Sequence, residues 1–104
     1  FMIIYNVTVS IDKEIEKQWF DWMKNTHIPD VMNTALFLDC KISRVLSEEV
    51  GGHTYSVQYS CKNRQDYEKY QNEFAPKLQA HHSKKFAGKF TAFRTLLEVV
   101  HRHE

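Results

Sequence analysis

Two tryptophans and a histidine stand close together in the first third of the chain. Trp19 and Trp22 are followed by His27-Ile28-Pro29. Large aromatic side chains dominate burial energetics, so the pair predicts either core packing or one wall of an apolar pocket. His27 titrates near neutral pH and would be a natural proton carrier, although a histidine at a helix end also binds terminal carbonyls.

A second set of polar residues projects from segments that read as strands. Asn6, Gln58 and Arg94 are the members of this set, and Arg94 can hold a carboxylate through two parallel hydrogen bonds. Tyr55 and Tyr59 alternate with polar neighbours and add aromatic surface nearby. Two interpretations stay open for the polar set, namely ligand orientation and a hydrogen-bond network at a subunit interface or in solvent.

The sequence gives little support for a metal site or a cofactor site. Adjacent histidines such as His81 and His82 point about 100° apart on a helix and chelate poorly. His101 and His103 could share a face, but no cysteine or paired carboxylate stands at metal-site spacing. No phosphate-binding loop, dinucleotide fingerprint or nucleophile elbow is present, so we expect neither a metal nor a cofactor.

The elements that position these residues follow from hydrophobic periodicity. Residues 2–11 alternate apolar and polar side chains and predict a strand. Asp12 is a predicted N-cap, and Ile15, Trp19, Trp22 and Met23 then recur at helical spacing. Because Pro29 disfavours helix at the preceding residue, we expect this helix to end near residues 25–27. Pro29 can then start a short second turn through Val31 and Met32.

The rest of the chain repeats this pattern with a hairpin in its middle. Residues 37–46 and 53–61 predict strands joined by a turn at residues 48–52. Asn63 predicts the cap of a second helix, which Pro76 kinks or breaks and Gly88 terminates. Residues 89–100 predict the last strand.

The order is therefore β-α-β-β-α-β, which in 104 residues indicates a single α+β domain over residues 1–104. The predicted fold is a ferredoxin-like sandwich, a four-stranded antiparallel sheet with two helices on one face. An apolar content of 42% excludes disorder, and a net charge of +1 gives no field that would attract a polyanion. Two cysteines, no visible signal segment and no long apolar run indicate a cytoplasmic protein without a membrane span.

The second face of that sheet carries apolar groups where a solvated face would alternate more cleanly. In the first strand, Ile4 and Met2 share a face with the polar Asn6 and Thr8. In the last strand, both faces carry apolar groups, with Phe93, Leu97 and Val99 on one and Phe90, Ala92, Leu96 and Val100 on the other. We expect a second copy of the chain to cover this face, giving a two-fold homodimer. A monomer with scattered surface apolar residues is the alternative.

Nucleic-acid binding is disfavoured, although the RNA-recognition motif shares the same element order. That motif stacks bases on exposed aromatic rings. If Val57 and Tyr59 face the core, Thr54 and Ser56 occupy the stacking positions, and neither has a ring.

Several stretches together are characteristic in sequence. They are residues 2–9, Trp19-x-x-Trp22-Met23 with His27-Ile28-Pro29, residues 55–59, Ala75-Pro76, and Phe90-x-Ala92-Phe93-Arg94-Thr95. The chain resembles, over nearly its whole length, an uncharacterised bacterial family of domain-of-unknown-function proteins, and this resemblance implies no activity. The layout is more distantly similar to the dimeric α/β-barrel superfamily, which includes small monooxygenases and isomerases and often holds a ligand between sheet and helices. Function does not follow from such a likeness.

These observations favour a small-molecule-binding or interaction module whose pocket is lined by Trp19, Trp22, Tyr55 and Tyr59, beside His27, Asn6, Gln58 and Arg94. The expected ligand is small, partly apolar and acidic. The alternative is a monooxygenase- or isomerase-like enzyme of the dimeric α/β-barrel type acting on such a molecule.

Overall fold

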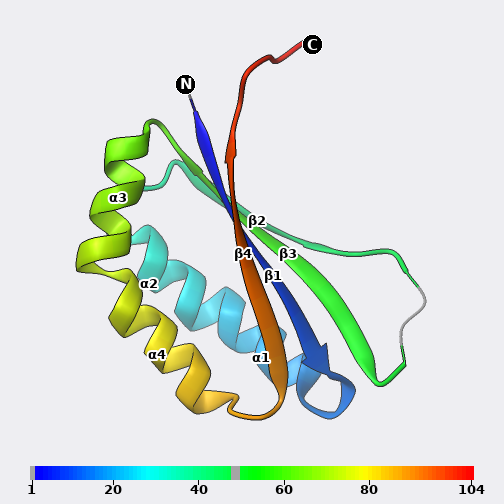
Figure 1. The fold of residues 1–104 in the computed structure, drawn as a ribbon. Coiled ribbons are helices and arrows are strands. Elements are labelled where there is room, and N and C mark those ends of the chain that lie inside the picture. Colours follow the sequence, from blue (N-terminus) through cyan, green and yellow to red (C-terminus); the bar gives the residue numbers. More distant parts are fainter. Residues whose placement is uncertain (1, 48–49) are drawn as a thin grey trace.

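The computed structural model describes residues 2–47 and 50–104, and four strands form its sheet (Figure 1). They are β1 (Ile3–Asp12), β2 (Asp39–Arg44), β3 (Gly52–Cys61) and β4 (Phe90–Glu98). All neighbours are antiparallel and the order is β2-β3-β1-β4. The predicted β-α-β-β-α-β order is confirmed, and the fold is ferredoxin-like.

The helices gather on one face of this sheet (Figure 1). The first helical segment runs without interruption through η1 (Lys13–Ile15), α1 (Glu16–Trp22), η2 (Met23–His27) and α2 (Ile28–Met32). The prediction that it ends near residues 25–27 is wrong, whereas the predicted helical turn from Pro29 through Val31 and Met32 is confirmed as α2. η2 is a π-helical turn, in which the Ile28 N–H donates to the Met23 carbonyl. Proline lacks an N–H and clashes with the carbonyl four residues earlier, and the wider π turn accommodates Pro29 without ending the helix.

The second helical segment is broken where the sequence predicted. α3 (Arg64–Glu73) and α4 (Ala75–Lys85) meet at Phe74, directly before the Ala75-Pro76 pair. The Asn63 side chain accepts a hydrogen bond from the Asp66 N–H at 2.8 Å, so its predicted cap is confirmed. Asp12, by contrast, ends β1 and its side chain makes no cap hydrogen bond.

Alternation along the strands separates a core face from what we call the open face. Odd-numbered residues of β1 and β3 point toward the helices, and Ile3, Tyr5, Val57 and Tyr59 are among those that are buried there. The open face carries the other parity. Its strand residues are Ile4, Asn6, Thr8, Ser10, Asp39, Lys41, Ser43, Thr54, Ser56, Gln58, Ser60, Thr91, Phe93, Thr95 and Leu97. Within the described residues no helix covers this face (Figure 1).

The β2–β3 connection depends on one close backbone approach. A Cβ on Gly52 would stand 1.9 Å from the Ile11 carbonyl oxygen, so only glycine fits at the start of β3. The predicted turn at residues 48–52 includes Glu48 and Glu49, which lie outside the described residues. No helix of residues 2–47 and 50–104 is long and apolar enough to cross a membrane.

Candidate functional site

A small pocket lies between the helical layer and the sheet, and we call it the helix–sheet pocket. Its volume is about 40 Å³. Such a volume accommodates a few water-sized groups, because a single water needs about 10–15 Å³ on this measure. The lining is apolar apart from a few polar groups, and consists of Tyr5, Val7, Val9, Met23, His27, Val57, Tyr59, Tyr70, Gln79, His82, Phe90, Ala92 and Arg94.

Arg94 reaches this pocket from β4. Its Nε donates to the Tyr5 hydroxyl oxygen at 3.1 Å, and the Gln79 Nε2 on α4 donates to the same oxygen at 3.4 Å. Arg94 has no carboxylate partner among the residues that the structure describes. Arg94 is exposed to solvent, so its guanidinium at the edge of this apolar pocket is accessible to an anionic ligand.

Two histidines from different helical segments meet at the same pocket. The rings of His27 and His82 lie 5.9 Å apart, edge to face. Trp22 stacks on His27 with 5.1 Å between ring centroids. The fully buried Trp19 donates its Nε1–H to the His82 Nε2 at 2.9 Å. The indole is a donor only, so this bond fixes which nitrogen of His82 is unprotonated.

Burial keeps both imidazoles neutral. It lowers the pKa of His27 to about 4, an effect that the nearby Asp30 carboxylate partly opposes and that His81 and Arg94 reinforce. Burial also lowers the pKa of His82 to about 4, and His27 and Arg94 act in the same direction. At neutral pH the fixed positive charge of the pocket is therefore Arg94.

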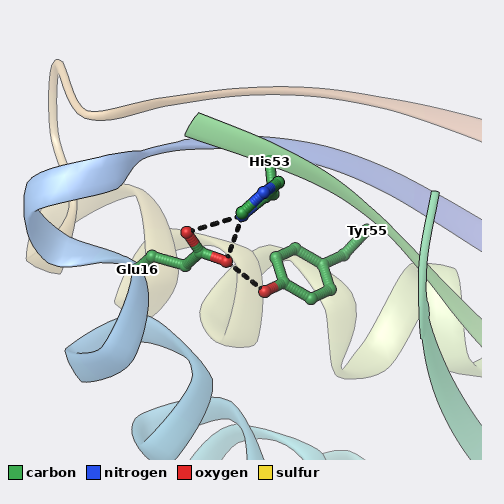
Figure 2. A network of polar contacts seen from close by, with 3 residues as sticks. All are labelled: Glu16, His53 and Tyr55. Carbon is green, nitrogen blue, oxygen red and sulfur yellow. Dashed lines mark hydrogen bonds and ion pairs between the residues drawn. The ribbon is translucent and has the colours of Figure 1, made fainter. Parts of the chain in front are cut away.

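A second polar cluster joins the start of α1 to β3 (Figure 2). The His53 Nδ1 donates to the two Glu16 carboxylate oxygens at 2.8 and 2.9 Å, and the Tyr55 hydroxyl donates to Oε2. Burial opposes ionisation of Glu16, but these hydrogen bonds outweigh it and lower the pKa of the carboxyl group. Burial and the bond to Glu16 raise the pKa of Tyr55 to about 12. The cluster anchors the first turn of α1 on the sheet.

The sequence matches the model of the domain of unknown function DUF4286 over residues 2–100. The chain belongs to the DUF4286 family. No curated protein matches its sequence.

Solved structures with the same fold share little sequence with this DUF4286 chain. A dimeric ferredoxin-like protein from an uncultured marine organism is 12% identical, with a TM-score of 0.78 and coverage of 98% of each chain. A candidate antibiotic biosynthesis monooxygenase from Bacillus cereus is 8% identical, with a TM-score of 0.71 and coverage of 100% of this chain and 98% of that one. SnoaB, a cofactor-independent oxygenase from Streptomyces nogalater, is 10% identical, with a TM-score of 0.67 and coverage of 96% and 95%. Likeness at this identity establishes only the fold, which is ferredoxin-like.

The DUF4286 chain does not bring all eight predicted site residues together. His27, Tyr59 and Arg94 line the helix–sheet pocket, and Trp22 stacks on His27 behind it. Trp19 lies in the core beneath His82, with its ring 5.0 Å from that of Tyr55. Tyr55 belongs to the cluster with Glu16.

Asn6 and Gln58 lie on the opposite side of the sheet, on the open face. Asn6 is buried there and donates to the Thr8 hydroxyl at 3.0 Å, while Ser56 donates to its side-chain oxygen at 2.5 Å. Gln58 borders a separate groove of about 320 Å³ with Ile4 and Lys41. The strand alternation that pairs Asn6 with Gln58 also separates both from His27 and Arg94.

Sequence reasoning did not select Tyr5, Gln79 or His82 as pocket residues, or Glu16 and His53 as partners. His82 is named above only as one of two adjacent histidines that would chelate a metal poorly. Its partner Trp19 is 63 residues distant in sequence, and Glu16 is 37 residues from His53. A signal was available for Tyr5, because it shares its strand parity with Tyr59.

Proposed function

We propose that this DUF4286 chain is a single-domain homodimeric protein that binds a small, partly apolar organic acid in the helix–sheet pocket. The observation that carries the ligand proposal is Arg94, a guanidinium with no counter-ion among the described residues that contacts the Tyr5 hydroxyl at the edge of an apolar pocket. Pockets of this kind combine an apolar lining with a few placed polar groups.

The homodimer is supported by the open face. Phe93 and Leu97 are 63% and 44% exposed there. Hydroxyl and amide groups surround them and supply the polar contacts that interfaces use. Covering about 800 Å² per subunit would give a specific interface. The marine protein with the same fold is named as dimeric, which agrees with this proposal.

Light scattering at micromolar concentration tests the dimer. We expect a mass of two chains for the native protein and one chain for Phe93→Lys, because a lysine ammonium cannot be buried without a partner. Leu38→Lys is the matched control, since Leu38 is also exposed but is not part of the open face. A native monomer, or a dimer that survives Phe93→Lys, would contradict this interface.

A thermal-shift screen of metabolites tests the ligand proposal. We expect hits among small organic acids and loss of the shift in Arg94→Ala and His27→Ala. Arg64→Ala is the control, because Arg64 is an exposed arginine that pairs with Glu68 away from the pocket. A hit whose shift survives both pocket substitutions would exclude this pocket.

A monooxygenase- or isomerase-like enzyme is the second candidate. Its support is His27, whose nitrogens make no hydrogen bond to any described residue and whose low pKa keeps the ring unprotonated at neutral pH. A neutral imidazole facing a bound acid is placed to accept a proton. Turnover of a hit by the native protein and its loss in His27→Ala would favour this candidate over simple binding.

The proposal also covers the cellular location of the protein and whether it binds nucleic acid. We place the protein in the bacterial cytoplasm because Cys40 and Cys61 are free thiols. Nucleic acid is not among its proposed partners, since Thr54 and Ser56 on the open face have no ring on which a base could stack.

A further inference from the structure

Hydrogen-bond directions in the helix–sheet pocket can be assigned from the donors whose chemistry is fixed. Arg94 has only N–H donors, so the Tyr5 oxygen accepts the bond from Nε. Gln79 Nε2 also donates to that oxygen. A phenol that accepts on both sides keeps its own hydrogen for a third partner. Tyr5 therefore presents an O–H donor.

His82 presents a second donor. Its Nε2 accepts the Trp19 indole N–H, so the hydrogen of the neutral ring must be on Nδ1. No described residue accepts from Nδ1, and His82 lines the pocket. Arg94 supplies the third donor through its terminal nitrogens, which have no hydrogen-bond partner in the described part of the chain.

Arg94 and Tyr5 are in direct contact, with Nε 3.1 Å from the hydroxyl oxygen. His82 lines the same pocket, and Arg94 is near enough to help lower its pKa. Neither Asp nor Glu occurs among the described lining residues. The volume corresponds to about three water-sized groups, which is the size of a carboxylate.

We propose that the pocket recognises its ligand by a carboxylate, which accepts hydrogen bonds from Tyr5, His82 and Arg94 while the organic body lies at the pocket mouth. This inference rests on the proposed function and adds the chemical group that is selected. An amide of the same shape brings an N–H₂ group that would face donors, and so leaves hydrogen bonds unmade.

Matched acid and amide probes test this selection. We would titrate the protein with acetate and acetamide, then with phenylacetate and phenylacetamide, and follow pocket resonances by NMR. Each acid should bind at least about tenfold more tightly than its amide. Tyr5→Phe should remove most of that preference, whereas Tyr67→Phe should leave it unchanged. Tyr67 contacts the Tyr5 ring but does not line the pocket.

Other outcomes separate this inference from the proposed function. Equal binding of acid and amide, abolished by Arg94→Ala, would overturn carboxylate selection and keep the pocket. No binding by either acid would overturn both carboxylate selection and the organic-acid ligand of the proposed function. Nitrogen-15 NMR of the unliganded protein gives an independent readout: His82 must carry its hydrogen on Nδ1, and an Nε2–H tautomer would refute the donor assignment.

Discussion

Acidification should destabilise the fold through His82 and His27. Each side chain has a pKa of about 4 in the folded protein, against an ordinary value of 6.5 in an unfolded chain. The unfolded chain therefore binds more protons than the folded one between these values. Stability is fully present above about pH 6.5, falls as the pH drops, and continues to fall until the folded pKa is reached.

The magnitude follows from the same two values. At about pH 5 an unfolded histidine is almost fully protonated, while the folded one is still mostly neutral. The difference is about 1.5 pK units, or about 2 kcal/mol for each histidine before screening. Both side chains are only partly buried, so solvent screens the effect and each contributes about 1 to 2 kcal/mol. The Glu16 carboxyl group loses its stabilising effect only at lower pH, since its pKa lies below 4.5.

Urea unfolding followed by tryptophan fluorescence, from about pH 7.5 to about pH 5, measures how steeply the free energy of unfolding falls with pH, which we call the pH slope. His82→Phe should lower stability at neutral pH, because the Trp19 N–H loses its acceptor, yet it should reduce the pH slope by about half. His101→Phe is the matched control, since His101 is exposed and is not among the groups that shift the pKa of His27 or His82, so its loss should leave the pH slope unchanged. A flat native profile, or equal slopes in native protein and His82→Phe, would refute the reasoning.

Four further changes probe the scaffold, each read from unfolding midpoints. Glu16→Gln should cost about 1 to 3 kcal/mol by weakening the bonds to His53 and Tyr55, and an unchanged midpoint would mean that this cluster does not anchor α1. Gly52→Ala should prevent folding or cost more than about 3 kcal/mol, because its Cβ would stand 1.9 Å from a backbone oxygen. Gly88→Ala has nothing near the new Cβ and a φ of 75°. It should therefore cost about 2 kcal/mol at most, and equal costs for the two glycine variants would contradict that distinction. Trp19→Phe should cost about 3 kcal/mol and should permit the other tautomer of His82, which nitrogen-15 NMR would detect.

The fold could be predicted because its signals are local. Alternation in β1 and β3, the Asn63 cap and the Pro76 break each depend on a few neighbouring residues, and the structure bears them out. The failure at residues 25–27 has an equally local cause. A rule that proline ends a helix omits the π turn, which shifts the hydrogen bonds by one residue and allows the helix to continue.

The site was predicted less completely, because contacts between distant segments create it. His82 lies four residues from both Leu78 and Phe86, a spacing that favours the apolar side of the helix, but its place in the pocket depends on contacts with distant residues such as Trp19. Asn6 and Gln58, by contrast, were predicted as site residues and do not lie in the pocket. Their residue types suggested ligand binding, but their strand parity places them across the sheet from Arg94.

The most direct test of the central claim is a crystal structure of the protein with its best-binding organic acid. The account predicts the carboxylate between the Arg94 guanidinium, the Tyr5 hydroxyl and the His82 Nδ1, with the open faces of two copies in contact. An acid bound beside Asn6 and Gln58, or one bound in the pocket with its carboxylate directed away from Arg94, would contradict it.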